Sequence, residues 1–238
     1  MGPSGAPEAR ADSEAVEYRE WWSRPGWARR YCRDFILRQQ EGEVRGYHAA
    51  VLAASIQGIA YLCERPVSVL DIGCGPAIRS SQIRGYFGCD VLAMDYSPAM
   101  LDEATNLQSA MRPEHRVTLM QGNANALPFE ANSFDVVYSS GTFMSIGEPA
   151  AAAAEALRVS RAGVVQIELC REAMSDDKRT SFKDTVTKHV RNRIWAHDYL
   201  SLWTRAGAKQ IIYAPLPGSF DGVTIAGYAR FIVCKEMA

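Results

Sequence analysis

The sequence lacks the features of a membrane-spanning or secreted chain. No apolar run approaches the roughly 18–20 residues that a membrane-spanning helix needs. The longest run, residues 49–62, is interrupted by Gln57 and Gly58. The first ten residues contain no apolar core like that of a secretory signal, and we interpret residues 1–11 as a disordered lead-in. These absences predict a cytoplasmic protein with no membrane partner.

The cysteine patterns of metal-binding and disulfide-rich proteins are also missing. The six cysteines form no Cys-x-x-Cys pair, and none lies near a histidine at zinc-finger spacing. A disulfide framework is not expected in a chain of this length without a secretory signal. We therefore predict reduced thiols and no metal site.

An excess of charge of one sign is absent. Lys and Arg total 26 against 27 Asp and Glu, so the net charge is −1. A dedicated nucleic-acid-binding protein is usually clearly basic, so no DNA partner is expected and an RNA partner is disfavoured. An RNA partner stays possible because four arginines could form a local basic patch: Arg24, Arg29, Arg30 and Arg33.

The sequence does have the apolar content of a folded core. It is 47% hydrophobic over 238 residues, which suits one large domain or a domain with an appendage. Helical patterns cover residues 12–22, 27–40 and 47–63. Pro25-Gly26 interrupts them, and Gly42 and Gly46 are expected to punctuate the chain between the second and the third. We predict that residues 12–65 form an N-terminal helical cap.

The pattern changes after Pro66. Short apolar runs typical of buried strands alternate with helical stretches, which predicts a parallel sheet with helices on both faces. The expected strands are residues 67–71, 90–95, 116–121, 133–138 and 164–169. The expected helices are residues 78–86, 98–111 and 149–160, and Gly163 is expected to end the last of them.

The C-terminal part has a different order. A helix expected at residues 197–206 is followed by strands at residues 208–214 and 228–235, which indicates an antiparallel pair closing the sheet. The predicted fold class is α/β. It is a doubly wound, mostly parallel, seven-stranded Rossmann-like sheet with a C-terminal antiparallel strand pair and an N-terminal helical cap. Residues 66–238 are expected to form its single large domain.

The sharpest motif is Asp71-Ile72-Gly73-Cys74-Gly75-Pro76-Ala77, which follows a buried strand and opens a helix. Glycines at such a turn allow positive φ and a close approach of the backbone to a ligand. The dinucleotide fingerprint needs Gly or Ala where Ile78 stands, and a phosphate loop needs a Gly-Lys-Ser/Thr sequence that is absent. Neither a nicotinamide cofactor nor a nucleoside triphosphate is therefore favoured.

The motif resembles the Asp/Glu-x-Gly-x-Gly-x-Gly segment of class I S-adenosylmethionine (SAM)-dependent methyltransferases, with Ala77 at the third glycine. Three later segments continue the resemblance: Asp95 with the Tyr96-Ser97-Pro98 that follows it, Gly122-Asn123-Ala124-Asn125-Ala126-Leu127-Pro128-Phe129, and Ser133-Phe134-Asp135-Val136-Val137. The resemblance covers about residues 67–170. It implies SAM as the cofactor and S-adenosylhomocysteine as its product.

The resemblance also assigns roles to single residues. Asp95 would accept the ribose hydroxyls, although Asp at that place also suits a helix N-cap. Asn123, where the family has Asp, would accept from the adenine amine. Asp71 and Ser139 would lie near the methionine end. Aromatic side chains of the cap would contact SAM through cation–π attraction or else pack on the core. The expected cofactor contacts are Tyr18, Trp22, Asp71, Gly73, Cys74, Gly75, Asp95, Tyr96, Met100, Gly122, Asn123, Ala124 and Ser139.

Three side chains are candidates for acid–base work. Glu168 is expected near the end of the fifth strand, where it could orient an acceptor or pair with a nearby base. His48 and His197 could deprotonate an acceptor, and His197 could instead cap a helix. A dedicated base is optional because alignment of the reacting atoms supplies much of the catalysis.

These expectations combine into one functional hypothesis. The chain would transfer the methyl group of SAM in line to an N or O atom, less favourably C, of a small metabolite, for example in natural-product biosynthesis. The Asn-Pro-Pro-Tyr type motif of amino-methylating DNA enzymes is absent at Tyr138–Thr142. An RNA methyltransferase and a non-catalytic SAM-binding subunit remain the alternatives. Monomer and homodimer both stay open.

Overall fold

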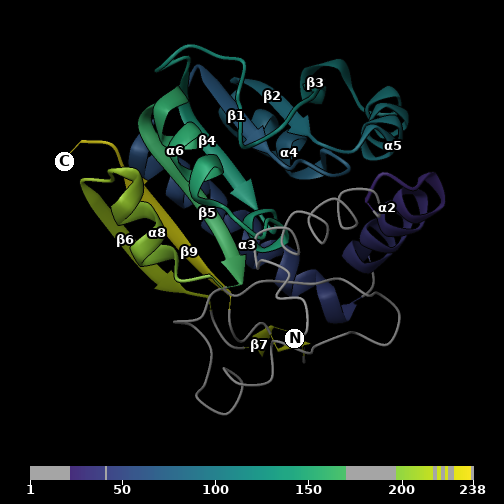
Figure 1. Ribbon diagram of the computed structural model, residues 1–238. Helices are drawn as coiled ribbons and strands as arrows, with labels where there is room; N and C mark the ends of the chain where they lie inside the picture. Colours follow the sequence, from purple (N-terminus) through teal and green to yellow (C-terminus); the bar gives the residue numbers. More distant parts are fainter. Residues whose placement is uncertain are drawn as a thin grey trace, which may run out of the picture.

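A computed structural model describes residues 22–40, 42–169, 197–216, 219–220, 223–224 and 228–236. Its centre is a seven-stranded sheet with the order β3-β2-β1-β4-β5-β9-β6 (Figure 1). The strands are β1 (Ser68–Ile72), β2 (Asp90–Asp95), β3 (Thr118–Gln121), β4 (Phe134–Ser140), β5 (Ser160–Leu169), β6 (Gln210–Pro215) and β9 (Tyr228–Cys234). A separate hairpin pairs β7 (Ser219–Phe220) with β8 (Val223–Thr224).

The strand directions confirm the predicted fold class. Strands β1 to β5 pair in parallel. Strand β9 pairs antiparallel with both β5 and β6, which makes the C-terminal antiparallel pair. The doubly wound, mostly parallel Rossmann-like sheet is therefore present.

Helices cover both faces of the sheet (Figure 1). They are α2 (Pro25–Gln40), α3 (Gly42–Leu62), α4 (Ile78–Phe87), α5 (Pro98–Ser109), α6 (Ala150–Val159) and α8 (Tyr199–Ala206), with short 3₁₀ turns η1 (Pro113–His115) and η2 (Phe143–Ser145). Helices α3, α4 and α5 pack on one face, and α6 and α8 on the other. No helix in the described part of the chain is both long and apolar enough to cross a membrane.

The alternation of side chains along each strand explains the two-sided core. In β1, Val69 packs toward α3 and α4, while Leu70 and Ile72 pack toward α6 and α8. A strand that buries both faces reads as a continuous apolar run, which is the pattern that the sequence shows. The apolar area removed from water on both faces is the main favourable term in folding.

The predicted cap consists of two parts with different contacts. Helix α3 lies directly on the sheet, where a Cβ on Gly58 would come within 2.7 Å of Val165. Helix α2 instead packs against α3 and α5, where Trp22 and Tyr31 pack against a buried cluster that contains Met100. Residues 1–21, which include the predicted lead-in, lie outside the described residues. The division of the chain at residues 65–66 stays a prediction.

Several predicted boundaries were wrong for local reasons. Gly46 lies inside α3, so it does not punctuate the chain there. Helix α6 ends at Val159, and Gly163 lies inside β5 with a φ of 152°. Helix α8 begins at Tyr199, because the Asp198 carboxylate caps it by accepting from the Ser201 N–H. His197 therefore lies before the helix.

Gly163 has a packing role that a helix-ending glycine would not have. A Cβ at this position would overlap the carbonyl oxygen of Val233 on β9. Backbone cannot move aside as a flexible side chain can. The glycine therefore permits the antiparallel contact between β5 and β9.

Gly163→Ala should cost about 3 kcal/mol of unfolding free energy, because it adds steric overlap to an unfavourable φ. Gly88→Ala is the matched control, since Gly88 also has a positive φ (66°) but has open space around it. The control should lose only about 1 kcal/mol, the cost of the backbone conformation alone. Urea denaturation of both variants measures the difference, and equal losses would contradict the packing role of Gly163.

Candidate functional site

The carboxyl ends of β1, β2, β3 and β4 meet at one edge of the sheet. The register places Ile72 beside both Met94 and Ser139, and Asp95 beside Gln121. The strand order reverses between β1 and β4, because β2 and β3 lie on one side of β1 while β4 and β5 lie on the other. Ligands of open α/β sheets bind at such a switch point. The loops that follow these strands contain most of the predicted cofactor contacts.

The two glycines of the loop after β1 (the glycine loop) differ in their surroundings. Gly73 is packed tightly against a neighbouring side chain, whereas Gly75 has space beside it. Gly73 has a φ of 75°, and a Cβ there would overlap the Thr142 side chain. Gly75 has a φ of 52°, and among the described residues its Cβ would meet only a ring carbon of Tyr31, at 4.0 Å. Gly73 is therefore required for packing, whereas Gly75 leaves its backbone accessible to a ligand.

Asp95 connects the glycine loop to the start of α5. Its Oδ2 accepts from the Gly75 N–H at 2.8 Å, and its Oδ1 accepts from the Ser97 N–H at 2.9 Å. Burial raises the pKa of Asp95, and the backbone N–H donors lower it part of the way. The N-cap of α5 is Ser97, whose hydroxyl accepts from the Met100 N–H. Each carboxylate oxygen keeps further acceptor capacity for a ribose hydroxyl.

The segment after β3 contains two amide side chains at the same edge. Asn123 Oδ1 accepts from the Asn125 N–H at 3.0 Å, which forms a local turn. Asn125 Oδ1 is buried and has no hydrogen-bond partner among the described residues. A Cβ on Gly122 would overlap the Met94 sulfur, so the Met94 side chain would have to shift to admit one. Ala124 packs at the margin of the core. A ligand donor could satisfy Asn125, a residue that the sequence analysis did not single out from its motif.

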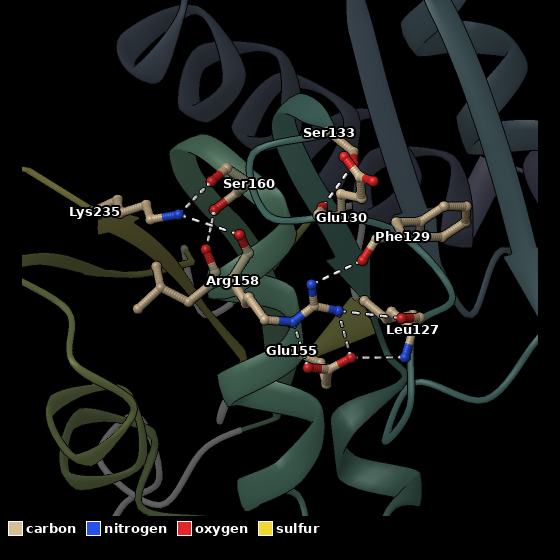
Figure 2. A network of polar contacts seen from close by, with 9 residues as sticks. Leu127, Phe129, Glu130, Ser133, Glu155, Arg158, Ser160 and Lys235 are labelled. Carbon is tan, nitrogen blue, oxygen red and sulfur yellow. Dashed lines mark hydrogen bonds and ion pairs between the residues drawn. The ribbon is translucent and has the colours of Figure 1, made fainter.

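A polar network fixes the rest of this segment to α6 (Figure 2). Arg158, in the last turn of α6, donates to the carbonyl oxygens of Leu127 at 3.1 Å and Phe129 at 2.8 Å. Glu155 accepts from the Leu127 N–H at 2.8 Å and from Arg158. The hydrogen bond from Arg158 lowers the pKa of Glu155. The Leu-Pro-Phe part of the motif is therefore an anchor to α6.

Side chains of α2, of α5 and of the residues just before each helix lie beside this edge of the sheet. The Trp22 and Tyr31 rings meet edge to face with centroids 5.4 Å apart. Met100 is 1% exposed and lies in this same contact, while Tyr96 is 43% exposed beside Asp95. Tyr18 lies outside the described residues. Tyr31, which lies within the predicted helix of residues 27–40, is the aromatic side chain placed nearest Gly75 in the part of the chain that the structure describes.

Three other predicted contacts are buried near the glycine loop. Asp71 is 2% exposed and accepts from the Ser80 hydroxyl at 2.6 Å. Ser139 is fully buried and donates to the Ile72 carbonyl oxygen at 3.1 Å. Burial, with added repulsion from Asp95 and Asp71, raises the pKa of the Cys74 thiol, so this cysteine stays protonated and unreactive.

The structure brings two of the three acid–base candidates to one turn. Glu168 is fully buried, and its carboxylate accepts from the N–H groups of Thr142, Phe143 and Met144. Burial raises its pKa to about 7, against the lowering effect of these donors. Nε2 of His197 lies 2.8 Å from the Ile146 carbonyl oxygen, and burial lowers the pKa of this histidine.

His48 lies on α3, which covers the face of the sheet opposite to that covered by α6 and α8. It is 9% exposed, and its carbonyl oxygen accepts from Arg79 of α4 at 3.1 Å. The three candidates therefore do not converge on a single reacting position in the structure.

Comparison with known proteins defines the family of the central region. Residues 70–167 match a family model described as a methyltransferase domain. The chain is 39% identical over 95 residues to a demethylmenaquinone methyltransferase of Renibacterium salmoninarum, which covers 40% of this chain and 37% of that protein. It is 37% identical over 101 residues to a malonyl-[acyl-carrier protein] O-methyltransferase of Enterobacter lignolyticus, which covers 42% and 36%. The chain thus spans little more than a third of each relative's length.

A solved structure has the same fold over a larger part of the chain. A SAM-dependent methyltransferase of Thermotoga maritima aligns with a TM-score of 0.59 and 18% identity, over 89% of this chain and 97% of that one. Residues 70–167 are therefore identified as a methyltransferase domain, and the chain has the fold of this SAM-dependent methyltransferase, in agreement with the resemblance. The relatives and the solved structure are all named as methyltransferases, which agrees with the prediction of SAM as the cofactor.

The residues of the edge fit SAM. Gly75 leaves space beside its backbone, Asp95 retains acceptor capacity, and Asn125 has a buried oxygen without a partner among the described residues. SAM contains ribose hydroxyls and an adenine amine that can donate to such oxygens, and it has no phosphate groups. The individual contacts remain predictions.

Asp71→Asn should remove part of the pH dependence of stability. Burial raises the pKa of Asp71 from 3.8 to about 7, so the folded state holds the proton more tightly than the unfolded state. This contribution is complete below pH 3.8 and is lost as the pH rises toward 7. Between pH 5 and pH 8 the wild type should lose about 3 kcal/mol through this group, and the variant should not.

Urea denaturation at the two pH values measures this change. The control is Asp102→Asn, which alters an exposed carboxylate on α5 and should keep the wild-type pH dependence. An unchanged slope in Asp71→Asn would show that Asp71 is ionised in the folded protein at pH 5.

Proposed function

We propose that the chain is a SAM-dependent methyltransferase that methylates an N or O atom of a small metabolite. The observation that carries the proposal is the meeting of three features at one sheet edge. These are the accessible Gly75 backbone, the Asp95 carboxylate that binds it, and the unsatisfied Asn125 oxygen. They lie within the residues that match the methyltransferase domain.

The strand order gives the direction in which SAM would lie. The adenine would lie by Asn123 and Asn125 after β3, and the ribose by Asp95 after β2. The amino-acid end would then extend past Gly73 and Gly75 toward β4, because β1 and β4 follow next in the sheet. When bound, SAM supplies a methyl group activated by its sulfonium. The contribution of the chain is to align an acceptor with that methyl group and to exclude water.

Charge pairing around α2 supports a small acceptor over RNA. Arg29 pairs with Glu103 at 3.3 Å, and Arg30 and Arg33 pair with Asp34 at 3.7 and 3.5 Å. Three of the four arginines of the predicted basic patch therefore share two carboxylates, Glu103 and Asp34, which offset two of their three positive charges. An RNA-binding surface depends on unneutralised cations that replace the counterions of phosphates. The two matching relatives are named for a quinone and for a carrier-bound malonyl group, which are not nucleic acids.

Asp95→Asn should weaken S-adenosylhomocysteine binding at least about tenfold, because charge-assisted hydrogen bonds to the ribose become neutral ones. Asp90→Asn is the matched control. Asp90 lies on the same strand at the opposite edge and pairs with Arg84 at 2.9 Å. Isothermal titration should give the control wild-type affinity, and unchanged affinity in Asp95→Asn would remove Asp95 from the site.

The function itself is tested by titration and by transfer of label. S-adenosylhomocysteine should bind saturably at 1:1, and NADH, titrated in parallel, should not. With methyl-labelled SAM, label should pass to small molecules of a cell extract. Label passing to RNA would overturn the small-acceptor proposal in favour of an RNA methyltransferase. Binding without transfer to any fraction would favour a non-catalytic SAM-binding subunit.

A further inference from the structure

The turn Thr142–Ile146, which follows β4 and contains η2, is held at its two ends by the buried Glu168 and the half-buried His197. At its start, Glu168 Oε1 accepts from the N–H groups of Thr142 at 2.8 Å and Phe143 at 2.9 Å, and Oε2 accepts from that of Met144 at 3.2 Å. At its end, His197 Nε2 lies 2.8 Å from the Ile146 carbonyl oxygen. A carbonyl oxygen only accepts, so this nitrogen is the donor.

These contacts satisfy groups that a short helical turn leaves without partners. The first N–H groups and the last carbonyl groups of any helix have no partner within it. Glu168 serves the first set, and His197 serves the second. Phe143 is fully buried, whereas Thr142, Met144 and Ile146 are half-buried.

The same turn is in direct contact with the glycine loop. The Thr142 hydroxyl lies 3.1 Å from the Ile72 carbonyl oxygen and 3.2 Å from that of Gly73, and it donates to them. The Thr142 side chain also fills the space that a Cβ on Gly73 would need. A shift of the turn would therefore move the loop or leave a gap beside it.

The turn is connected to the rest of the core by further contacts. The Phe143 ring lies 5.7 Å from that of Trp203, and Trp203 Nε1 donates to Gln166 on β5 at 2.7 Å. The Gly141 N–H donates to the Ile167 carbonyl oxygen at 2.9 Å. The turn is thus bound to β5 and α8 as well as to β1.

We propose that Glu168 and His197 are positioning residues that hold the turn Thr142–Ile146, so that Thr142 braces the glycine loop for the amino-acid end of SAM. Both would act through the backbone of the turn and not as an acid or a base. The inference rests on the proposed function, because it needs SAM at this edge. It also predicts that removing either side chain weakens the binding of the amino-acid end of the ligand and not that of the adenosine.

The test compares two ligands of the full-length chain by isothermal titration. S-adenosylhomocysteine contains the amino-acid end, and methylthioadenosine keeps the adenosine and sulfur without it. Glu168→Gln should weaken S-adenosylhomocysteine binding at least about tenfold and methylthioadenosine binding less than about twofold. The amide keeps the shape, but it loses the charge and places a donor against the backbone N–H groups.

Asp135→Asn is the matched control. Asp135 lies near the start of β4, and its carboxylate also accepts from backbone N–H groups, those of Val67 at 2.8 Å and Ser68 at 3.1 Å. It should lower the melting temperature without changing either affinity. If Glu168→Gln changed only the melting temperature, as the control does, the inference would be overturned.

Thr142→Val keeps the test decisive if Glu168→Gln does not fold. It removes the hydroxyl, keeps the shape, and should show the same preferential loss of S-adenosylhomocysteine affinity. Thr142→Ser should restore it. Failure of the wild type to bind S-adenosylhomocysteine would overturn the proposed function as well. Normal wild-type binding with no effect in either variant would overturn only this inference.

His197 is tested with a pair of variants. His197→Gln keeps a side-chain N–H and should retain S-adenosylhomocysteine affinity within about twofold. His197→Phe keeps the ring without a donor and should weaken the affinity several-fold. If both variants instead kept the affinity but abolished methyl transfer, His197 would be the base and not a positioning residue.

Discussion

The site depends on how tightly the glycine loop is held between its two neighbouring strands. From the β4 side, Thr142 fills the space beside Gly73 and donates to the loop. From the β2 side, the Asp95 carboxylate accepts from the Gly75 N–H at 2.8 Å. A loop ordered in advance costs a ligand less conformational entropy on binding. The parallel register makes this arrangement possible, because it brings the ends of all three strands to one edge.

Buried carboxylates near this edge differ in how their charge is compensated. Asp71 is 2% exposed and has one hydroxyl donor, from Ser80, whereas Glu168 is fully buried and receives three backbone N–H groups. An uncompensated buried charge is costly, so these donors decide what each carboxylate can do. Glu168 can hold a turn, whereas Asp71 joins β1 to α4. The more exposed Glu155–Arg158 pair orders the segment after β3 mainly through its geometry, since ion pairs near the surface contribute little energy.

Much of the fold could be predicted because strand and helix periodicity is local. The alternation after Pro66 predicted the parallel strands in the right order along the chain, and the C-terminal pair was predicted as antiparallel. Gly163 was misread because a glycine that ends a helix and a glycine that admits a neighbouring strand look alike in sequence. Only the overlap with Val233 distinguishes them. Gly58 is similar in that its importance comes from a close tertiary contact, here between α3 and Val165 on the sheet.

The candidate site was partly predictable. The motif residues Gly73, Gly75, Asp95 and Asn123 follow three different strands, and the structure brings them to one edge. Tyr31, Asn125 and Thr142 had no such signal. Tyr31 is one aromatic residue on an ordinary helix face, Asn125 is one of two similar amides, and Thr142 matters only through its contact with a distant glycine. Trp22 packs against the buried cluster that contains Met100, and the roles of both residues toward SAM remain predictions.

The sequence by itself determined the fold class and the motifs of the methyltransferase domain, because these depend on periodicity and on short segments whose spacing is local. Only the tertiary structure decided what the polar residues do within that frame. Glu168 and His197 meet at one turn although 29 positions separate them in the chain, while His48 lies on the opposite face of the sheet. Such placements depend on which strands become neighbours and on the space between them, and no local pattern of residues encodes either.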